Sequence, residues 1–137
     1  MTDFLSSLKI AATGLHAQNA RMRVIAENLA NADSAGKTPT EQPYRRRIPT
    51  FEAVMDQDAG GETVKVGKIA LDMSDFQSRY EPGHPAADAN GYVKYPNVDP
   101  LIEAMDMREA QRTYEANLNV VTVTRQMMSR TLDILKG

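Results

Sequence analysis

The chain has 137 residues, with 16 lysines and arginines against 18 aspartates and glutamates. Its length predicts one domain of ordinary size, and its formal net charge of -2 gives no overall attraction for nucleic acid. Cysteine is absent, which excludes disulfides, thiolate metal ligands and cysteine nucleophiles. An aromatic content of 6% without tryptophan predicts a core of aliphatic side chains and methionine.

The N-terminal part of the chain is free of proline and predicts one long helix over roughly residues 3–31. At a rise of 1.5 Å per residue this helix would be about 43 Å long. Its apolar positions alternate at spacings of three and four with one polar member, an a/d pattern typical of coiled coils: Leu5, Leu8, Ala12, Leu15, Asn19, Met22, Ala26 and Leu29. We expect the leucines and Met22 to lie in a packed core or an assembly contact.

The middle of the chain, residues 36–96, collects the turn-forming and aromatic residues and predicts a small β-rich insertion. Apolar residues alternate with polar ones over 64–66 and again, one position out of phase, over 69–73. Gly67 lies at the slip and predicts a bulge or bend within a two-part strand. An Asn-Gly pair predicts a hairpin-type turn before a short strand, Tyr92–Tyr95, which a proline ends.

The C-terminal part predicts a second long helix, because Asp99 is a capping residue, Pro100 suits the first helical position and no breaker follows before Lys136. The β-branched run 120–124 would ordinarily favour a strand, so this helix needs a packing neighbour. A second alternating pattern, less apolar than the first, comprises Met107, Ala110, Tyr114, Asn117, Val121, Thr124, Met128, Thr131 and Leu135.

The predicted fold is mainly α with a small β-rich insertion. The two helices are expected to pair in an antiparallel, coiled-coil-like terminal domain formed by residues 1–35 and 97–137, with residues 36–96 as the insertion. Core or assembly positions on the second helix would be Tyr114, Leu118, Val121, Met128, Leu132 and Leu135. Two helices pair along one seam only, so other apolar positions should face water: Ile10, Ile25, Leu118, Val120, Met127 and Ile134.

Catalytic and metal-binding patterns are absent from the sequence. His16 and His84 are too far apart for a two-histidine motif on one helix, and Ser6 with Lys9 forms a Ser-x-x-Lys match without the second motif that such enzymes need. There is no phosphate-cradling glycine loop and no calcium-loop spacing. We therefore expect no catalytic residue, no cofactor and no metal.

The sequence does not decide the roles of two groups of polar residues. Arg45–Arg47 is the only basic cluster and lies between Glu41 and Glu52, which favours a solvated or subunit-contacting strand edge over a phosphate site. Asn28 and Asn31 lie one turn apart on the first helix, and they either tie the exiting chain to the helix end or remain exposed near its terminus. Spacing alone does not choose between these readings.

Several segments in order carry a family resemblance: Asn28–Ser34, then Pro43–Arg45, Tyr80–Val93, Pro96–Asp99 and the tail from Tyr114 to Leu132. Together they resemble the bacterial flagellar basal-body rod proteins, members of the flagellar axial protein family. The resemblance spans nearly the whole chain. It implies structural roles for the motif residues Asn28, Asn31, Pro43, Tyr44, Tyr80, Pro82, Gly83, Gly91 and Tyr92.

The resemblance implies a non-enzymatic subunit of the proximal rod, which assembles helically into the drive shaft that transmits motor torque for motility. Its partners would be other proximal and distal rod subunits, the rod-to-ring adaptor and the flagellar export apparatus. Nucleic acid and small-molecule substrates would play no part. Such a protein is exported by the type III apparatus without a cleavable signal peptide, and works in the periplasmic basal body without inserting into the membrane.

Two alternatives come from other functional classes. A small cytoplasmic helical adaptor or chaperone-like module would use exposed heptads to capture a partner helix. An enzyme acting on cell-wall material is a weaker alternative, because the sequence holds no catalytic constellation.

Overall fold

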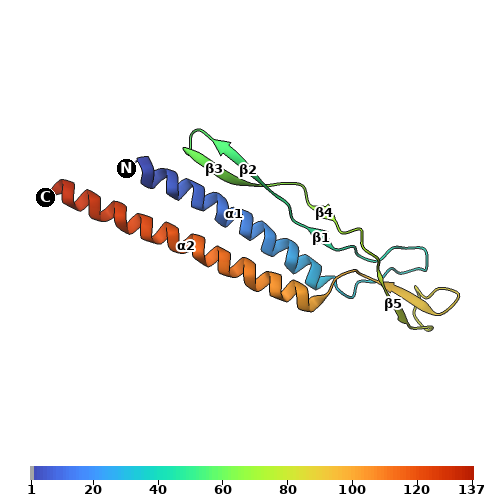
Figure 1. The fold of residues 1–137 in the computed structure, drawn as a ribbon. Helices are drawn as coiled ribbons and strands as arrows, with labels where there is room; N and C mark the ends of the chain where they lie inside the picture. Colours follow the sequence, from blue (N-terminus) through green and yellow to red (C-terminus); the bar gives the residue numbers. More distant parts are fainter. Residues whose placement is uncertain (1) are drawn as a thin grey trace. The chain divides into compact units, whose positions relative to one another are not determined.

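The computed structural model describes residues 2–137 and has a long helix at each end of this range. These helices are α1 (Thr2–Ala30) and α2 (Pro100–Lys136), and short strands lie between them in the chain (Figure 1). The sequence predicts both helices to within two residues at each end. The mainly helical fold with a small β insertion is thereby confirmed.

Side-chain caps define where the helices begin and end. The Asp99 carboxylate accepts the N–H of Leu101 at 3.0 Å, which satisfies one of the free donors at the start of α2. At the end of α1, the Asn31 amide donates to the Glu27 carbonyl at 2.9 Å and accepts the Ser34 hydroxyl at 3.1 Å. Asn31 is therefore a capping residue that ends α1.

The strands form antiparallel pairs only, and each sheet among the described residues has two strands. The pairs are β1 (Arg47–Ile48) with β4 (Ala70–Leu71), β2 (Phe51–Asp56) with β3 (Gly61–Val66), and β5 (Gln77–Tyr80) with β6 (Tyr92–Tyr95). The predicted two-part strand is confirmed, because it divides into β3 and β4 around Gly67. Gly67 continues the β2–β3 register by one pair, because its N–H donates to the Thr50 carbonyl at 2.8 Å, and β4 begins three residues later.

The Asn90–Gly91 pair is a turn, but not the tight hairpin that the sequence predicted. The connection between β5 and β6 takes residues 81–91, and the pair forms only its last corner. Gly91 has a φ of 85°, which glycine adopts without strain. The Asp88 carboxylate accepts the N–H groups of Asn90 and Tyr92 at 2.9 and 3.0 Å, so this acidic side chain organises the corner.

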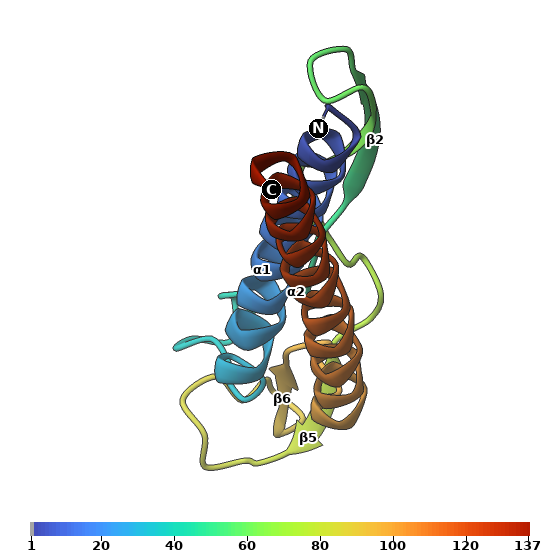
Figure 2. The ribbon, with the colours of Figure 1, turned by 90° about the vertical axis from the view of Figure 1, so that its left-hand side faces the viewer.

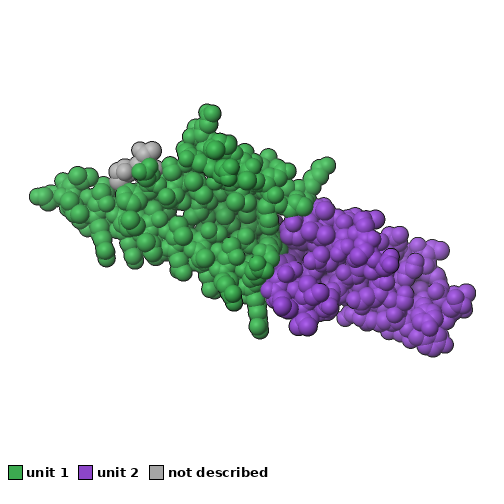
Figure 3. All heavy atoms as spheres, in the orientation of Figure 1, with its two compact units in different colours: residues 1–22, 50–68, 108–137 green, residues 23–49, 69–107 purple. Residues whose placement is uncertain are grey.

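The chain forms two compact units, each with segments of both helices (Figure 3). We call residues 1–22, 50–68 and 108–137 the helix–hairpin unit, and residues 23–49 and 69–107 the junction unit. These units are defined by packing contacts. The predicted domains, residues 1–35 with 97–137 and residues 36–96, are defined instead by whether a segment is helical or β-rich. The predicted domain division stays a prediction.

In the helix–hairpin unit, α1 and α2 run antiparallel and side by side (Figures 1 and 2). Arg21 of α1 forms an ion pair with Glu109 of α2 at 3.7 Å. About two helix turns away, Gly14 of α1 faces Asn117 of α2. A Cβ on Gly14 would lie 2.9 Å from the Asn117 amide nitrogen, so the glycine makes room for this side chain. The buried residues of this unit are small: Ala11, Ala17, Ala59, Thr63, Ala110 and Thr124.

The junction unit has larger buried side chains. Val93 and Tyr95 of β6 pack with Ala86 in a cluster that Ala35 and Ala87 extend. The Tyr95 hydroxyl donates to the Glu81 carboxylate at 2.6 Å, which satisfies the polar end of this buried ring. Further buried residues are Val24, Ile25 and Val98.

The predicted seam of α2 lies on the helix face that packs, with one error. Met107 through Thr131 are buried or half-buried at the predicted spacing. Leu135, in contrast, is 73% exposed, so its placement in the core of the chain is wrong. Val120, Met127 and Ile134 are exposed as expected. Leu118 and Leu132, predicted as core or assembly positions, are 45% and 42% exposed, so they do not lie in the core of the chain and their part in assembly stays a prediction.

The predicted seam of α1 does not coincide with its buried face. Leu5 is 56% exposed, while Leu8, Leu15, Met22 and Leu29 are only half-buried. The buried residues of α1 are instead Ala11, Ala17, Val24, Ile25 and Asn28, which also corrects the expectation that Ile25 faces water. Small side chains permit close approach of two helix backbones, so the contact uses them in place of the leucines.

Candidate functional site

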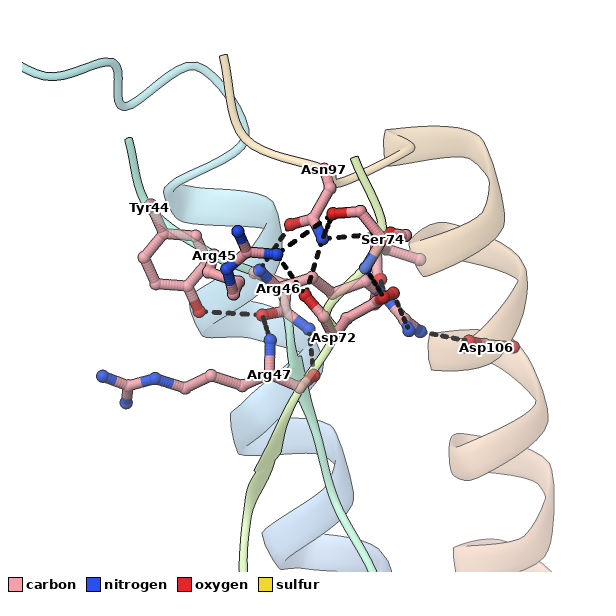
Figure 4. A network of polar contacts seen from close by, with 10 residues as sticks. Tyr44, Arg45, Arg46, Arg47, Asp72, Ser74, Asn97 and Asp106 are labelled. Atoms are coloured by element: carbon pink, nitrogen blue, oxygen red, sulfur yellow. Dashed lines mark hydrogen bonds and ion pairs between the residues drawn. The ribbon is translucent and has the colours of Figure 1, made fainter. Parts of the chain in front are cut away.

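Asn28 joins the end of α1 to strand β1 in the junction unit. Its side chain is 1% exposed. The amide oxygen accepts the Arg47 N–H at 3.0 Å and the Tyr44 hydroxyl at 2.7 Å, and the amide nitrogen donates to the Arg47 carbonyl at 2.9 Å (Figure 4). The amide therefore pairs with both backbone groups of Arg47, as a neighbouring strand would. Of the two readings that spacing left open, the structure has Asn28 tying the chain to the helix.

Burial raises the pKa of the Tyr44 phenol, and the negative charges of Glu27 and Glu103 add to this effect against the opposing charge of Arg47. The neutral phenol is the form that donates to Asn28. This hydrogen bond is therefore formed throughout the neutral pH range.

Arg46 is the centre of a charged cluster beside Asn28. Its guanidinium forms ion pairs with Glu103, with Asp72 at 3.4 Å and with Asp106 at 3.7 Å (Figure 4). Burial by itself lowers the pKa of Arg46, but the hydrogen bond and charge of Glu103, with those of Asp72, outweigh it and leave the pKa above its ordinary value. The cluster links the start of α2 to the segments around β1 and β4.

Glu103 is 1% exposed, and one of its carboxylate oxygens has no hydrogen-bond partner among the described residues. A buried carboxylate depends on its paired cation, because an uncompensated charge in the interior is costly. Arg46 is thus required to keep Glu103 in place.

Asp72 and Asn97 complete the network. The Asp72 carboxylate accepts the Ser74 N–H at 2.9 Å, and bonds from Ser74 together with Arg46 lower the pKa of Asp72 below its ordinary value. The Asn97 amide accepts the Arg46 N–H at 2.8 Å and donates to the Asp72 carbonyl at 2.9 Å. Asn97, two residues before the helix cap Asp99, is thereby fixed to the segments that contain Arg46 and Asp72.

The three consecutive arginines have separate roles. Arg45 donates to the carbonyls of Asp72 and Ser74 at 2.8 and 3.0 Å and lies 4.1 Å above the Phe76 ring. Arg47 pairs with Glu27 at 3.2 Å at the surface. The Arg46 side chain is only 22% exposed, so the prediction of a solvated strand edge is wrong for this residue. Its carboxylate partners are distant in sequence, and spacing could not reveal them.

The other motif residues lie around the β5–β6 pair and the segment before β1. Pro43 is buried beside Tyr44 in the chain, while Pro82 and Gly83 are exposed in the connection 81–91. The rings of Tyr80 and Tyr92 meet edge to face at 5.3 Å. Gly91 lies against the Tyr80 ring, because a Cβ there would come within 2.8 Å of it. The roles of these residues in assembly stay predictions.

The helix–hairpin unit has a second candidate site, a set of exposed apolar side chains on the C-terminal half of α2. Its side chains are between 42% and 78% exposed: Leu118, Val120, Val123, Met127, Leu132, Ile134 and Leu135. We call these residues the outer face of α2. Seven large apolar side chains left exposed on one half of a helix are typical of a surface that a partner covers.

Features for metal binding or membrane crossing do not appear in residues 2–137. No three histidine, aspartate or glutamate side chains in this range lie close enough together to hold a metal ion. The His84 ring accepts the Ala86 N–H at 3.0 Å and so stabilises a turn. Neither α1 nor α2 has an apolar stretch suited to spanning a bilayer.

Two family models match this chain, and both describe components of the flagellar rod. Residues 8–36 match the flagella basal body rod protein family, and residues 89–134 match the flagellar basal body rod FlgEFG protein C-terminal family. These ranges include Asn28, Asn31, Glu103 and, except for Leu135, the outer face of α2. The matched segments and the two long helices define the chain as a flagellar rod protein.

Full-length relatives make the assignment specific. The flagellar basal-body rod protein FlgC of Agrobacterium fabrum is 50% identical over 100% of this chain and 99% of its own length. The FlgC proteins of Aquifex aeolicus and Salmonella typhimurium are 38% and 43% identical over 99% and 95% of this chain, and over 100% and 96% of their own lengths. The chain belongs to the FlgC family of flagellar basal-body rod proteins. It is a structural subunit and not an enzyme, which decides against the adaptor and cell-wall enzyme alternatives.

Proposed function

We propose that this chain is a proximal-rod subunit that assembles helically with other axial proteins into the drive shaft that transmits motor torque. The observation that carries the proposal is the outer face of α2, whose exposed apolar residues one α1 helix cannot cover. Covering them with neighbouring subunits buries apolar surface, which is the main favourable term in association. A head-to-tail contact that does not close on itself generates a helical tube.

The terminal segments 1–35 and 97–137 would act together in this assembly as a coiled-coil-like domain. On α1, the stripe Leu5, Leu8, Leu15, Met22 and Leu29 is half-buried or exposed and therefore available to a neighbouring helix. On α2, Leu118, Leu132 and Leu135 are available in the same way. Close packing of such helices in the tube would give the stiffness that a drive shaft needs.

The proposed setting is the periplasmic part of the basal body. Neighbours would be other proximal and distal rod subunits and the rod-to-ring adaptor, with delivery by the flagellar export apparatus without cleavage of a signal peptide. The relatives support this setting through their shared description as basal-body rod proteins.

The test is a charged substitution on the outer face of α2. Val123 is 52% exposed, so Val123→Asp should leave the folded chain intact while placing a carboxylate in the contact between subunits. We expect loss of swarming and loss of the chain from purified basal bodies. Gln126→Asp adds the same charge at an exposed position nearby and should have a much smaller effect. Normal swarming by Val123→Asp would overturn the proposal.

A further inference from the structure

A groove lies between the β2–β3 hairpin and α1 within the helix–hairpin unit. It has a volume of about 760 Å³, and its apolar lining includes Ala12 of α1 and Val54, Met55, Val64 and Val66 of the hairpin. Met55 is 66% exposed, and Val54 and Val64 are each 39% exposed. We call this surface the hairpin groove.

The walls of the hairpin groove are held by specific contacts. The Val64 N–H donates to the Thr13 hydroxyl at 3.2 Å, which attaches β3 to α1. At the hairpin tip, Gly61 lies against Ile10, where a Cβ would come within 3.1 Å of the isoleucine side chain. The groove is therefore a preformed surface, and a partner need not open it.

The charged groups around the groove favour an acidic partner. Lys9 and Lys65 lie at the groove, and neither takes part in the ion pairs found within residues 2–137. The acidic group in the lining is Asp56, whose carboxylate already accepts the N–H groups of Asp58 and Ala59. An apolar stripe flanked by carboxylates would complement this arrangement.

The start of α2 has such a stripe. Leu101, Ile102 and Met105 are 71%, 52% and 62% exposed, and they lie on the side of the helix away from buried Glu103. Asp99 and Asp106 flank them in sequence. Asp99 caps α2, and Asp106 shares the single guanidinium of Arg46 with Asp72 and Glu103, so this end of α2 keeps an excess of negative charge. We call these three apolar residues the α2 start stripe.

Electrostatics distinguishes this stripe from the other exposed apolar surface of α2. The last part of that helix has Arg125, Arg130 and Lys136 against Asp133. Its basic groups would repel Lys9 and Lys65, whereas the acidic start of α2 attracts them.

We propose that the hairpin groove of one copy receives the α2 start stripe of a second copy. This inference rests on the proposed function, because it assigns a contact within the rod. The two surfaces differ, so the contact is head-to-tail and each copy has one free groove and one free stripe for the next. Met105 is flexible enough to fill an irregular groove of this kind.

The absence of native cysteine makes a clean cross-linking test possible. The double variant Ala12→Cys with Ile102→Cys would be expressed in place of the wild-type chain, and basal bodies would be purified and oxidised. A head-to-tail contact gives a ladder of dimers, trimers and larger species, whereas each single variant gives none. Ala12→Cys with Val123→Cys is the matched control, because Val123 and Ile102 are both 52% exposed.

Charge reversal tests the partner's chemistry. Adding Lys9→Glu and Lys65→Glu to the first double variant should slow cross-linking about fivefold, a factor typical of exposed charge pairs. An unchanged rate, or a ladder of equal yield from the Val123→Cys control, would contradict the proposed occupant.

The remaining outcomes separate the two proposals. If basal bodies contain the chain but the double variant gives no ladder, the groove contact is wrong and the rod assignment stands. Cross-linking of Ala12→Cys to a different rod protein would also overturn a second copy as the occupant. If the wild-type chain is absent from basal bodies, both proposals fail.

Discussion

The two units of this molecule are stabilised in different ways. The junction unit buries branched and aromatic side chains and satisfies polar groups such as Asn28 and Arg46 internally. The buried residues of the helix–hairpin unit are only alanines and threonines, and its large apolar side chains are half-buried or exposed. The junction unit thus has a core of large side chains and an internal polar network, whereas in the helix–hairpin unit more of the apolar surface is left for contacts with other subunits.

Removing Arg46 should have the largest effect on the junction unit. Arg46→Met leaves buried Glu103 without its cation, which should lower the free energy of unfolding by about 3–5 kcal/mol. Four of the five tyrosines lie in this unit, so near-ultraviolet circular dichroism in urea reports its unfolding. Arg47→Met, which breaks only a surface pair, should cost about 1 kcal/mol or less. Equal losses in both variants would contradict the buried cluster.

Asn28→Ala should have the next largest effect. It leaves the Arg47 backbone and the Tyr44 hydroxyl without partners in a buried place, which should lower the free energy of unfolding by about 2–3 kcal/mol. Asn31→Ala is the matched control, because it removes a helix cap at a more accessible position and should cost about 1 kcal/mol. The same urea transitions measure both. A loss below that of Asn31→Ala would show that the amide is not essential to the junction.

A larger residue at Gly14 tests the close helix contact of the other unit. Gly14→Leu should push α1 away from Asn117 and lower the free energy of unfolding by about 1–3 kcal/mol. Gly14→Ala with Asn117→Ala removes the clash and should raise stability by about 1 kcal/mol, because alanine favours a helix over glycine. Far-ultraviolet circular dichroism during thermal unfolding distinguishes these results. Equal behaviour of the two variants would mean that the helices do not approach closely here.

The smallest expected effect concerns acid. Because the pKa of Asp72 lies below its ordinary value of 3.8, its charge stabilises the fold above that value and this contribution is lost as pH falls through the lower, folded-state pKa. Asp72→Asn should therefore weaken the fall in stability with acid between about pH 4 and pH 2. Urea titrations across this range measure the slope, with Asp133→Asn as the control at an exposed position. An unchanged slope in Asp72→Asn would contradict the role of its charge.

Much of the fold could be predicted, because its signals are local. The cap at Asp99 and the proline after it mark the start of α2, and Gly67 marks the break between β3 and β4. The buried face of α1 could not be predicted from apolar periodicity, which favours leucine over alanine as a core residue. Ala11, Gly14 and Ala17 form the contact because of their small size, and that reason appears only when the opposing helix is present.

The polar site around Asn28 and Arg46 could also be predicted only in part. Asn28 could be singled out from its place near a helix end, and the family resemblance implies a structural role for it. Its partner atoms are backbone groups of Arg47, which carry no mark in a sequence. Glu103, Asp72 and Asn97 have no sequence pattern that pairs them with Arg46.

The Asn28 amide also has a consequence for mispairing. A strand as short as β1 has two edges, and β4 covers one of them. The other edge presents the N–H and C=O of Arg47, which could hydrogen-bond to an extended segment of a stray chain. Asn28 occupies both groups. Aspartate lacks the N–H donor, and glutamine is one methylene longer. Asparagine therefore suits this position, where it blocks the free edge of β1 from pairing with a strand of another chain.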